Sequence, residues 1–258
     1  MSEALNRATR AIREADLPRL VLELGDLPAT FHGFHLSREG ILDNATMAEQ
    51  GFPGNSVESF VAMGRITGYV REFVAPLPPG GVIPAGYDLA VATVAHLFEA
   101  PEGVSRWMRE IFLGQFEANV GQEVHPDQQL LMVERLSFQG FADEVIGLRV
   151  LQSSPSGPVS STVVDFRVGR LLGVVYVASS GNCERRAVVE QIGQMLERQF
   201  VRVALGAEPL PSLAPGEAVG GPHGSLSPWE GVRVRVVPNA SHRLGCPYPG
   251  ALPAGEEA

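Results

Sequence analysis

The chain has 258 residues, of which 45% are hydrophobic and 19% charged, so it carries enough apolar material for one sizeable core or two small ones. The net charge of −9 argues against nucleic-acid binding, because that function needs a basic face to neutralise phosphates. The sequence contains no lysine, which excludes Schiff-base, pyridoxal phosphate and Walker-type phosphate chemistry.

Residues 1–16 are predicted to form an N-terminal amphipathic helix, since Leu5, Ala8 and Ile12 recur at helical spacing. The segment lacks the apolar stretch of a secretory signal, and no run in the chain reaches the roughly 20 apolar residues of a transmembrane helix. We therefore expect a cytoplasmic protein as the sequence stands, with an envelope-associated or secreted location as the alternative if the N-terminus is truncated.

Residues 17–206 show the periodicities of a folded α+β domain. Strands are predicted over 20–24, 65–74, 87–98, 144–152, 162–168 and 171–178, with a further short strand at 31–36 and a short helix at 55–63. Long amphipathic helices are predicted over 101–119, with Pro101 in the first turn, and over 182–205, with Asn182 as N-cap. From 207 to 258 the composition turns to Pro, Gly and Ser, which predicts a mostly irregular tail.

A strand-then-helix unit therefore occurs twice, once around residues 87–119 and once around residues 162–205. This pattern predicts an α+β fold, in which a mostly antiparallel sheet carries the two long amphipathic helices on one face. Two organisations stay open: a single domain, or two pseudo-repeated halves over 17–121 and 122–206.

Cys183 is the candidate for a reactive thiol. It is expected in the first turn of the second long helix, beside Arg185 and Arg186, where the helix N-terminus and the positive charge favour a thiolate. A half-buried residue without a role, or a disulfide with Cys246, are the alternatives. Because the chain lacks a CxxC pair and the common catalytic motifs, we expect no metal, no cofactor and no assigned catalytic residue.

Several short segments carry a resemblance to a family. They are 26–28, 33–34, 64–69, 94–98 with the following helix, and 165–171 with the following helix. Over roughly residues 17–205 the chain resembles a set of uncharacterised bacterial proteins of the Chloroflexota type. The resemblance implies an exported or lipid-anchored protein, although this chain lacks a signal peptide, and it implies no activity and no site residues.

We expect a non-catalytic binding or interaction module for a small apolar ligand or a partner protein. The candidate ligand-binding residues are aromatic and are expected on the sheet face opposite the helices or in the seam between the two halves: Phe31, Phe34, Tyr69, Phe73 and Tyr87. Two alternatives stay open. One is an enzyme of unrecognised class, for instance a thiol-dependent one using Cys183; the other is a structural subunit of a larger assembly, such as a homo-oligomer, with the tail as a strap.

Overall fold

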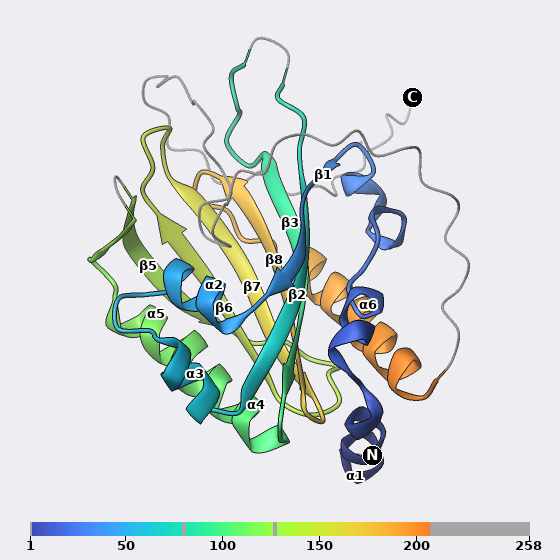
Figure 1. Cartoon of the computed structure of the whole chain (residues 1–258). Coiled ribbons are helices and arrows are strands. Elements are labelled where there is room, and N and C mark those ends of the chain that lie inside the picture. The colour runs from blue at the N-terminus through green and yellow to red at the C-terminus, as the bar shows by residue number, and fades with distance from the viewer. Residues whose placement is uncertain (1, 79–80, 126–127, 207–258) are drawn as a thin grey trace, which may run out of the picture.

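An eight-stranded antiparallel sheet forms the middle of the molecule, in the strand order β1-β2-β3-β8-β7-β6-β5-β4, with helices against both of its faces (Figure 1). This is a computed structural model, and it describes residues 2–78, 81–125 and 128–206. The α+β class and the antiparallel sheet predicted from the sequence are confirmed. The tail predicted over 207–258 lies outside the described residues.

The strands fall close to the apolar runs of the sequence. They are β1 (His35–Leu42), β2 (Arg65–Val74), β3 (Asp88–Phe98), β4 (Glu123–His125), β5 (Gln128–Leu136), β6 (Val145–Gln152), β7 (Val159–Val168) and β8 (Leu171–Ser180). The central strands β3 and β8 are buried on both faces, which explains why their sequences are almost continuously apolar instead of alternating. Gly169 and Arg170 form the tight turn between β7 and β8.

The helical elements are mostly short, except for the last. They are α1 (Ser2–Ala8), the 3-10 turns η1 (Thr9–Ala11), η2 (Glu14–Arg19), η3 (Leu24–Asp26) and η4 (Ala29–Phe31), then α2 (Asn44–Gln50), α3 (Val57–Ala62), α4 (Pro101–Trp107), the π-helical η5 (Met108–Gly114), α5 (Gln115–Ala118) and α6 (Arg186–Ala204). The three elements from Pro101 to Ala118 follow one another without a break and correspond to the first predicted long helix.

One face of the sheet is covered by α6 and by the N-terminal segment, and the largest apolar cluster lies there. Leu196 and Phe200 of α6 pack with Phe166 and Val164 of β7 in this cluster. The N-terminal segment is fastened to the sheet through Arg170, whose guanidinium donates to the carbonyl oxygens of residues 9, 12 and 98. The 1–16 segment is therefore part of this layer.

The opposite face is covered by α2, α3 and the helical stretch 101–118, so the two long helices lie on different faces of the sheet (Figure 1). The prediction that both pack on one face is wrong. Its physical reason is that β3 and β8 are apolar on both sides, so their sequences do not select the face to which the following helix returns.

The pseudo-repeat is not confirmed. β3 and β8 are neighbouring antiparallel strands, and a two-fold axis relating two such strands would run through the sheet and place both following helices on the same face. The observed opposite placement breaks that symmetry.

Two local predictions fail at irregular backbone. The strand expected over 20–24 is a bend followed by the turn η3, although Leu20, Val21 and Leu22 are buried as a strand would require. The last helix begins at Arg186 with Arg185 as its N-cap, not at Asn182, and the Arg185 N–H is satisfied instead by Thr162 Oγ1 at 2.9 Å.

Candidate functional site

A cavity lies between the sheet and the helices α2, α3 and 101–118, with a free volume of about 90 Å³. A buried water needs roughly 10–15 Å³ on this measure, so the space suits several waters or one small organic ring. Most of the lining is apolar, and six aromatic side chains contribute to it: Phe52, Phe60, Trp107, Phe112, Phe116 and Tyr176. An apolar hollow with few polar groups is the common form of a small-molecule site.

The floor of the cavity is one transverse row of the sheet. Val94 of β3 pairs with Val174 of β8, and Val174 pairs with Asp165 of β7. Val174 stays only half-buried although it lies in a central strand beneath helices, because the cavity leaves its side chain uncovered. The row places a carboxyl group beside two valines.

Asp165 is the least compensated polar group of the site. It is 2% exposed, its Oδ1 has no hydrogen-bond partner, and no ion pair reaches it within the described part of the chain. Burial alone raises the pKa of the Asp165 carboxyl well above its usual range, which favours the protonated form. Burying such a group without a partner costs free energy, which makes it a candidate for function.

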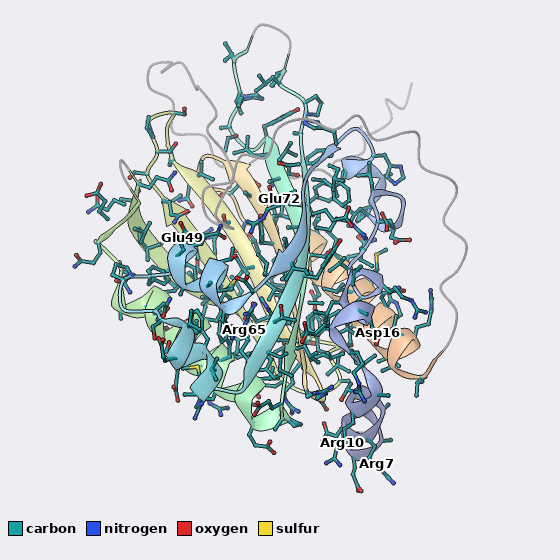
Figure 2. The ribbon with its side chains drawn as sticks, viewed as in Figure 1. Arg7, Arg10, Asp16, Glu49, Arg65 and Glu72 are labelled. Carbon is teal, nitrogen blue, oxygen red and sulfur yellow. The ribbon has the colours of Figure 1, made fainter. Side chains whose placement is uncertain are left out.

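His96 and Arg65 form the polar edge of the same site. Arg65 projects from the start of β2 (Figure 2), where it donates to His96 Nδ1 at 2.9 Å, to the Leu42 carbonyl at 2.7 Å and to Asn44 Oδ1 at 2.6 Å. Its guanidinium also lies 5.5 Å from the centre of the Trp107 ring. Because an arginine only donates, His96 Nδ1 must accept, and the hydrogen of the imidazole sits on Nε2.

Burial lowers the pKa of both groups. For Arg65 burial is the main cause, partly offset by Asp43, and the pKa falls to about 9, so the guanidinium remains charged at neutral pH. For His96 burial and the adjacent Arg65 lower the pKa well below its usual value, which keeps the imidazole neutral. Gly68 permits this contact, because a Cβ there would collide with His96 Nδ1 and Arg65 Nη2.

Tyr176 connects the cavity to a second buried acid. Its hydroxyl donates to Glu72 Oε2, and the other oxygen, Oε1, has no partner. Glu72 lies further along β2 than Arg65 (Figure 2), on the same face of the sheet. Burial raises the pKa of Glu72, although the Tyr176 hydroxyl and Arg38 pull it down, and burial beside Glu72 raises that of Tyr176.

The rim is closed by a pair of amides. Asn55, just before α3, and Gln115, at the start of α5, each donate to the other, at 3.1 Å and 2.6 Å. Between Trp107 and Gln115 the helix is π-helical, which turns Ile111 and Phe112 towards the cavity. Single π-helical turns are frequent at functional sites.

The five aromatic residues predicted to bind a ligand lie elsewhere. Phe31 and Phe73 are buried in the α6-side core, and Phe34 and Tyr69 pack against that core from partly buried positions. Tyr87 donates its hydroxyl to the Pro76 carbonyl at 2.7 Å. None of the five lines the cavity, and the open sheet face expected for them is occupied by the N-terminal segment and α6.

Cys183 precedes α6 by three residues, is 3% exposed and is disulfide-bonded; Cys246 lies outside the described residues. Cys183 is therefore not a free thiol in this structure, and its reactivity stays a prediction. Across residues 2–78, 81–125 and 128–206, no group of three or more His, Cys, Asp or Glu side chains is arranged to hold a metal ion. No helix in the same ranges is long and apolar enough to span a bilayer.

Comparison with known proteins places the chain by its fold. No family model matches it, and none of the curated proteins matches it. Among solved structures, the extracellular domain of PknH from Mycobacterium tuberculosis is similar, with a TM-score of 0.50 and 9% identity over 74% of this chain and 97% of that domain. At this identity the likeness concerns the fold alone.

Proposed function

We propose that the protein is a non-catalytic binding module whose cavity between the sheet and the helices 44–62 and 101–118 holds a small, mostly apolar ligand. The observation that carries the proposal is Asp165, an unpartnered carboxyl group on the floor of an otherwise apolar hollow. If position 165 served stability alone, a valine there would stabilise the fold more than an unpartnered aspartate does.

The surroundings of Asp165 support binding rather than chemistry. Of the titratable groups in the lining, His96 is fixed by Arg65 and Tyr176 is fixed by Glu72, so neither is placed as a nucleophile and its base. The enzyme and the structural-subunit alternatives have no comparable supporting observation among the described residues.

The test uses Trp107, which lines the cavity, as its own reporter. In a Trp229→Phe background Trp107 is the remaining tryptophan, so its fluorescence follows the site. We expect toluene to produce a saturable change in that fluorescence. Val174→Phe should abolish the change by filling the cavity, at a tolerable overpacking cost of about 1–3 kcal/mol.

Val201→Phe is the matched control, because Val201 is also half-buried but belongs to α6 on the other face. It should leave toluene binding intact. A titration without saturation, or equal loss in both variants, would overturn the proposal.

The disulfide at Cys183 and the likeness to an extracellular domain support the envelope-associated or secreted alternative over the cytoplasmic one. Thiol labelling in lysates quenched at once with acid tests this point. Labelling of Cys183 before any reductant is added would contradict it.

A further inference from the structure

We propose that the ligand of this cavity is a small apolar amine, bound as its ammonium ion with the charge against Asp165. The inference rests on the function proposed above and adds the chemical class of the head group. It follows from what Asp165 lacks and from what surrounds it.

Asp165 lacks any donor. Its neighbours along the transverse row are Val174 on β8 and Ile146 on β6, neither of which can donate a hydrogen bond. No hydrogen bond and no ion pair to this carboxyl occurs within residues 2–78, 81–125 and 128–206, while the residue lines the cavity. A ligand that brings a positively charged donor supplies the missing partner, and charge-assisted hydrogen bonds are the stronger kind.

The aromatic lining favours the same charge. Rings from residues 52–60, from the helical stretch 101–118 and from the sheet surround the hollow. The ring centres of Phe52 and Phe116 lie 5.0 Å apart and those of Phe112 and Phe116 lie 5.8 Å apart, both in edge contact. The faces of aromatic rings attract cations, and a desolvated ammonium gains most from them. The apolar body of the ligand is accommodated by the same side chains.

An anionic head group is disfavoured. Both terminal nitrogens of Arg65 already donate hydrogen bonds, to Leu42, Asn44 and His96. No arginine is among the described residues that line the cavity, so an anion would meet only neutral donors there, such as the Nε2–H of His96, and would gain no ion pair.

Arg65 does not outweigh the attraction of an ammonium to Asp165. The two residues stand on β2 and β7, three strand spacings apart, which is roughly 14 Å. Since the Coulomb energy falls as the inverse of distance, a contact pair with Asp165 at ~4 Å outweighs the repulsion from a guanidinium held three strands away. The other titratable groups that line the cavity are His96 on β3 and Tyr176 on β8, and both are neutral at pH 7.

The experiment compares three probes of one size in the Trp229→Phe protein at pH 7: benzylamine, benzyl alcohol and benzoate. We expect benzylamine to bind at least about tenfold more tightly than benzyl alcohol, and benzoate to bind weakest. Calorimetry in two buffers of different ionisation enthalpy should show proton release with benzylamine, because Asp165 ionises when the ammonium arrives, and none with benzyl alcohol.

Asp165→Asn should remove the preference for benzylamine over benzyl alcohol, measured as the ratio of their two dissociation constants. Glu197→Gln is the matched control, because Glu197 is another buried acid but lies on the α6 face and should not alter the preference. If Asp165→Asn does not fold, Asp165→Val, which continues the valine row, serves the same purpose.

The outcomes separate the two proposals. Equal binding of benzylamine and benzyl alcohol, tightest binding of benzoate, benzylamine binding without proton release, or a preference that survives both Asp165 variants would overturn the amine assignment while the cavity still binds apolar ligands. Failure of toluene and of all three probes would overturn the binding function itself.

Discussion

The two faces of the sheet differ in whether their buried charged groups have partners. On the α6 face, Arg71 is 6% exposed but is paired with Glu23 at 2.8 Å and with Glu39 at 2.5 Å. On the helical face, Asp165 and one oxygen of Glu72 are buried without partners beside a cavity. The first face is arranged for stability, and the second keeps unfavourable groups that a ligand would compensate.

Packing differs in the same direction. Phe166 on the α6 face is fully buried, with ring centres 5.2 Å from Phe141 and 5.6 Å from Phe200, and Gly173 opposite it leaves room for the ring. Its chain neighbour Asp165 faces the hollow on the other side. Successive residues of one strand thus serve two different purposes, as the alternation of a strand allows.

The largest expected effect on the free energy of unfolding concerns the α6 face. Phe166→Ala should lower the free energy of unfolding by about 3–5 kcal/mol, because it removes a buried ring from a site that cannot collapse around the void. Phe112→Ala, beside the existing cavity, should cost at least about 1 kcal/mol less, since one side of this ring borders a hollow and the substitution therefore removes fewer packing contacts. Urea denaturation of both variants measures the difference, and equal losses would remove the contrast between the faces.

The next effect has the opposite sign. Asp165→Val should raise the free energy of unfolding of the unliganded protein by about 1–3 kcal/mol at pH 7, because it removes an unpartnered buried carboxyl. Chemical denaturation measures this gain. A loss of stability would show that Asp165 has a structural role.

The gain from Asp165→Val should depend on pH. Burial raises the folded-state pKa of Asp165, so below about pH 4 both the folded and the unfolded wild-type chain hold the proton. As the pH rises, the unfolded chain releases its proton first, and the wild type loses stability by up to about 1.4 kcal/mol per pH unit until the folded carboxyl also ionises. The advantage of the variant therefore grows with pH, and a constant difference would show that Asp165 is charged in the folded state.

The smallest effect concerns the rim. Asn55→Ala and Gln115→Ala should each lower stability by about 0.5–1.5 kcal/mol, and the double variant by less than the sum, because the two amides bond to each other. A double-mutant cycle from thermal melts gives the coupling energy. Additive losses would mean that the amide pair does not join α3 to α5.

The sheet was largely predictable, because strands such as β3 and β8 need apolar residues at almost every position. The face chosen by each helix was not, since those same strands look alike from both sides. The sequence predicts a strand at the bend Leu20–Leu22, because three apolar residues in a row fit a buried strand as well as a buried bend and show no periodicity that would separate the two.

The site was hidden by a similar ambiguity. Trp107, Phe112 and Phe116 follow helical spacing, which is typical of core residues, and they do pack in the core while also lining the cavity. The signal that sequence reasoning missed is Asp165, an acid that shares a strand face with Val163 inside a buried run. Nothing in the sequence alone distinguishes it from a paired acid, because the pairing depends on neighbouring strands.

The fastening of the N-terminal segment has a consequence for synthesis on the ribosome. Arg170 donates hydrogen bonds to Phe98, 72 residues away, and to Thr9, 161 residues away. The central strand pair likewise joins distant parts of the chain, because β3 ends at Phe98 and β8 begins just after Arg170. β3 therefore emerges long before its partner β8 exists, and the two parts of the sheet join only when translation of the domain is nearly complete. Such non-local topologies fold slowly and leave apolar edges exposed meanwhile, so the nascent chain is a natural client for chaperones.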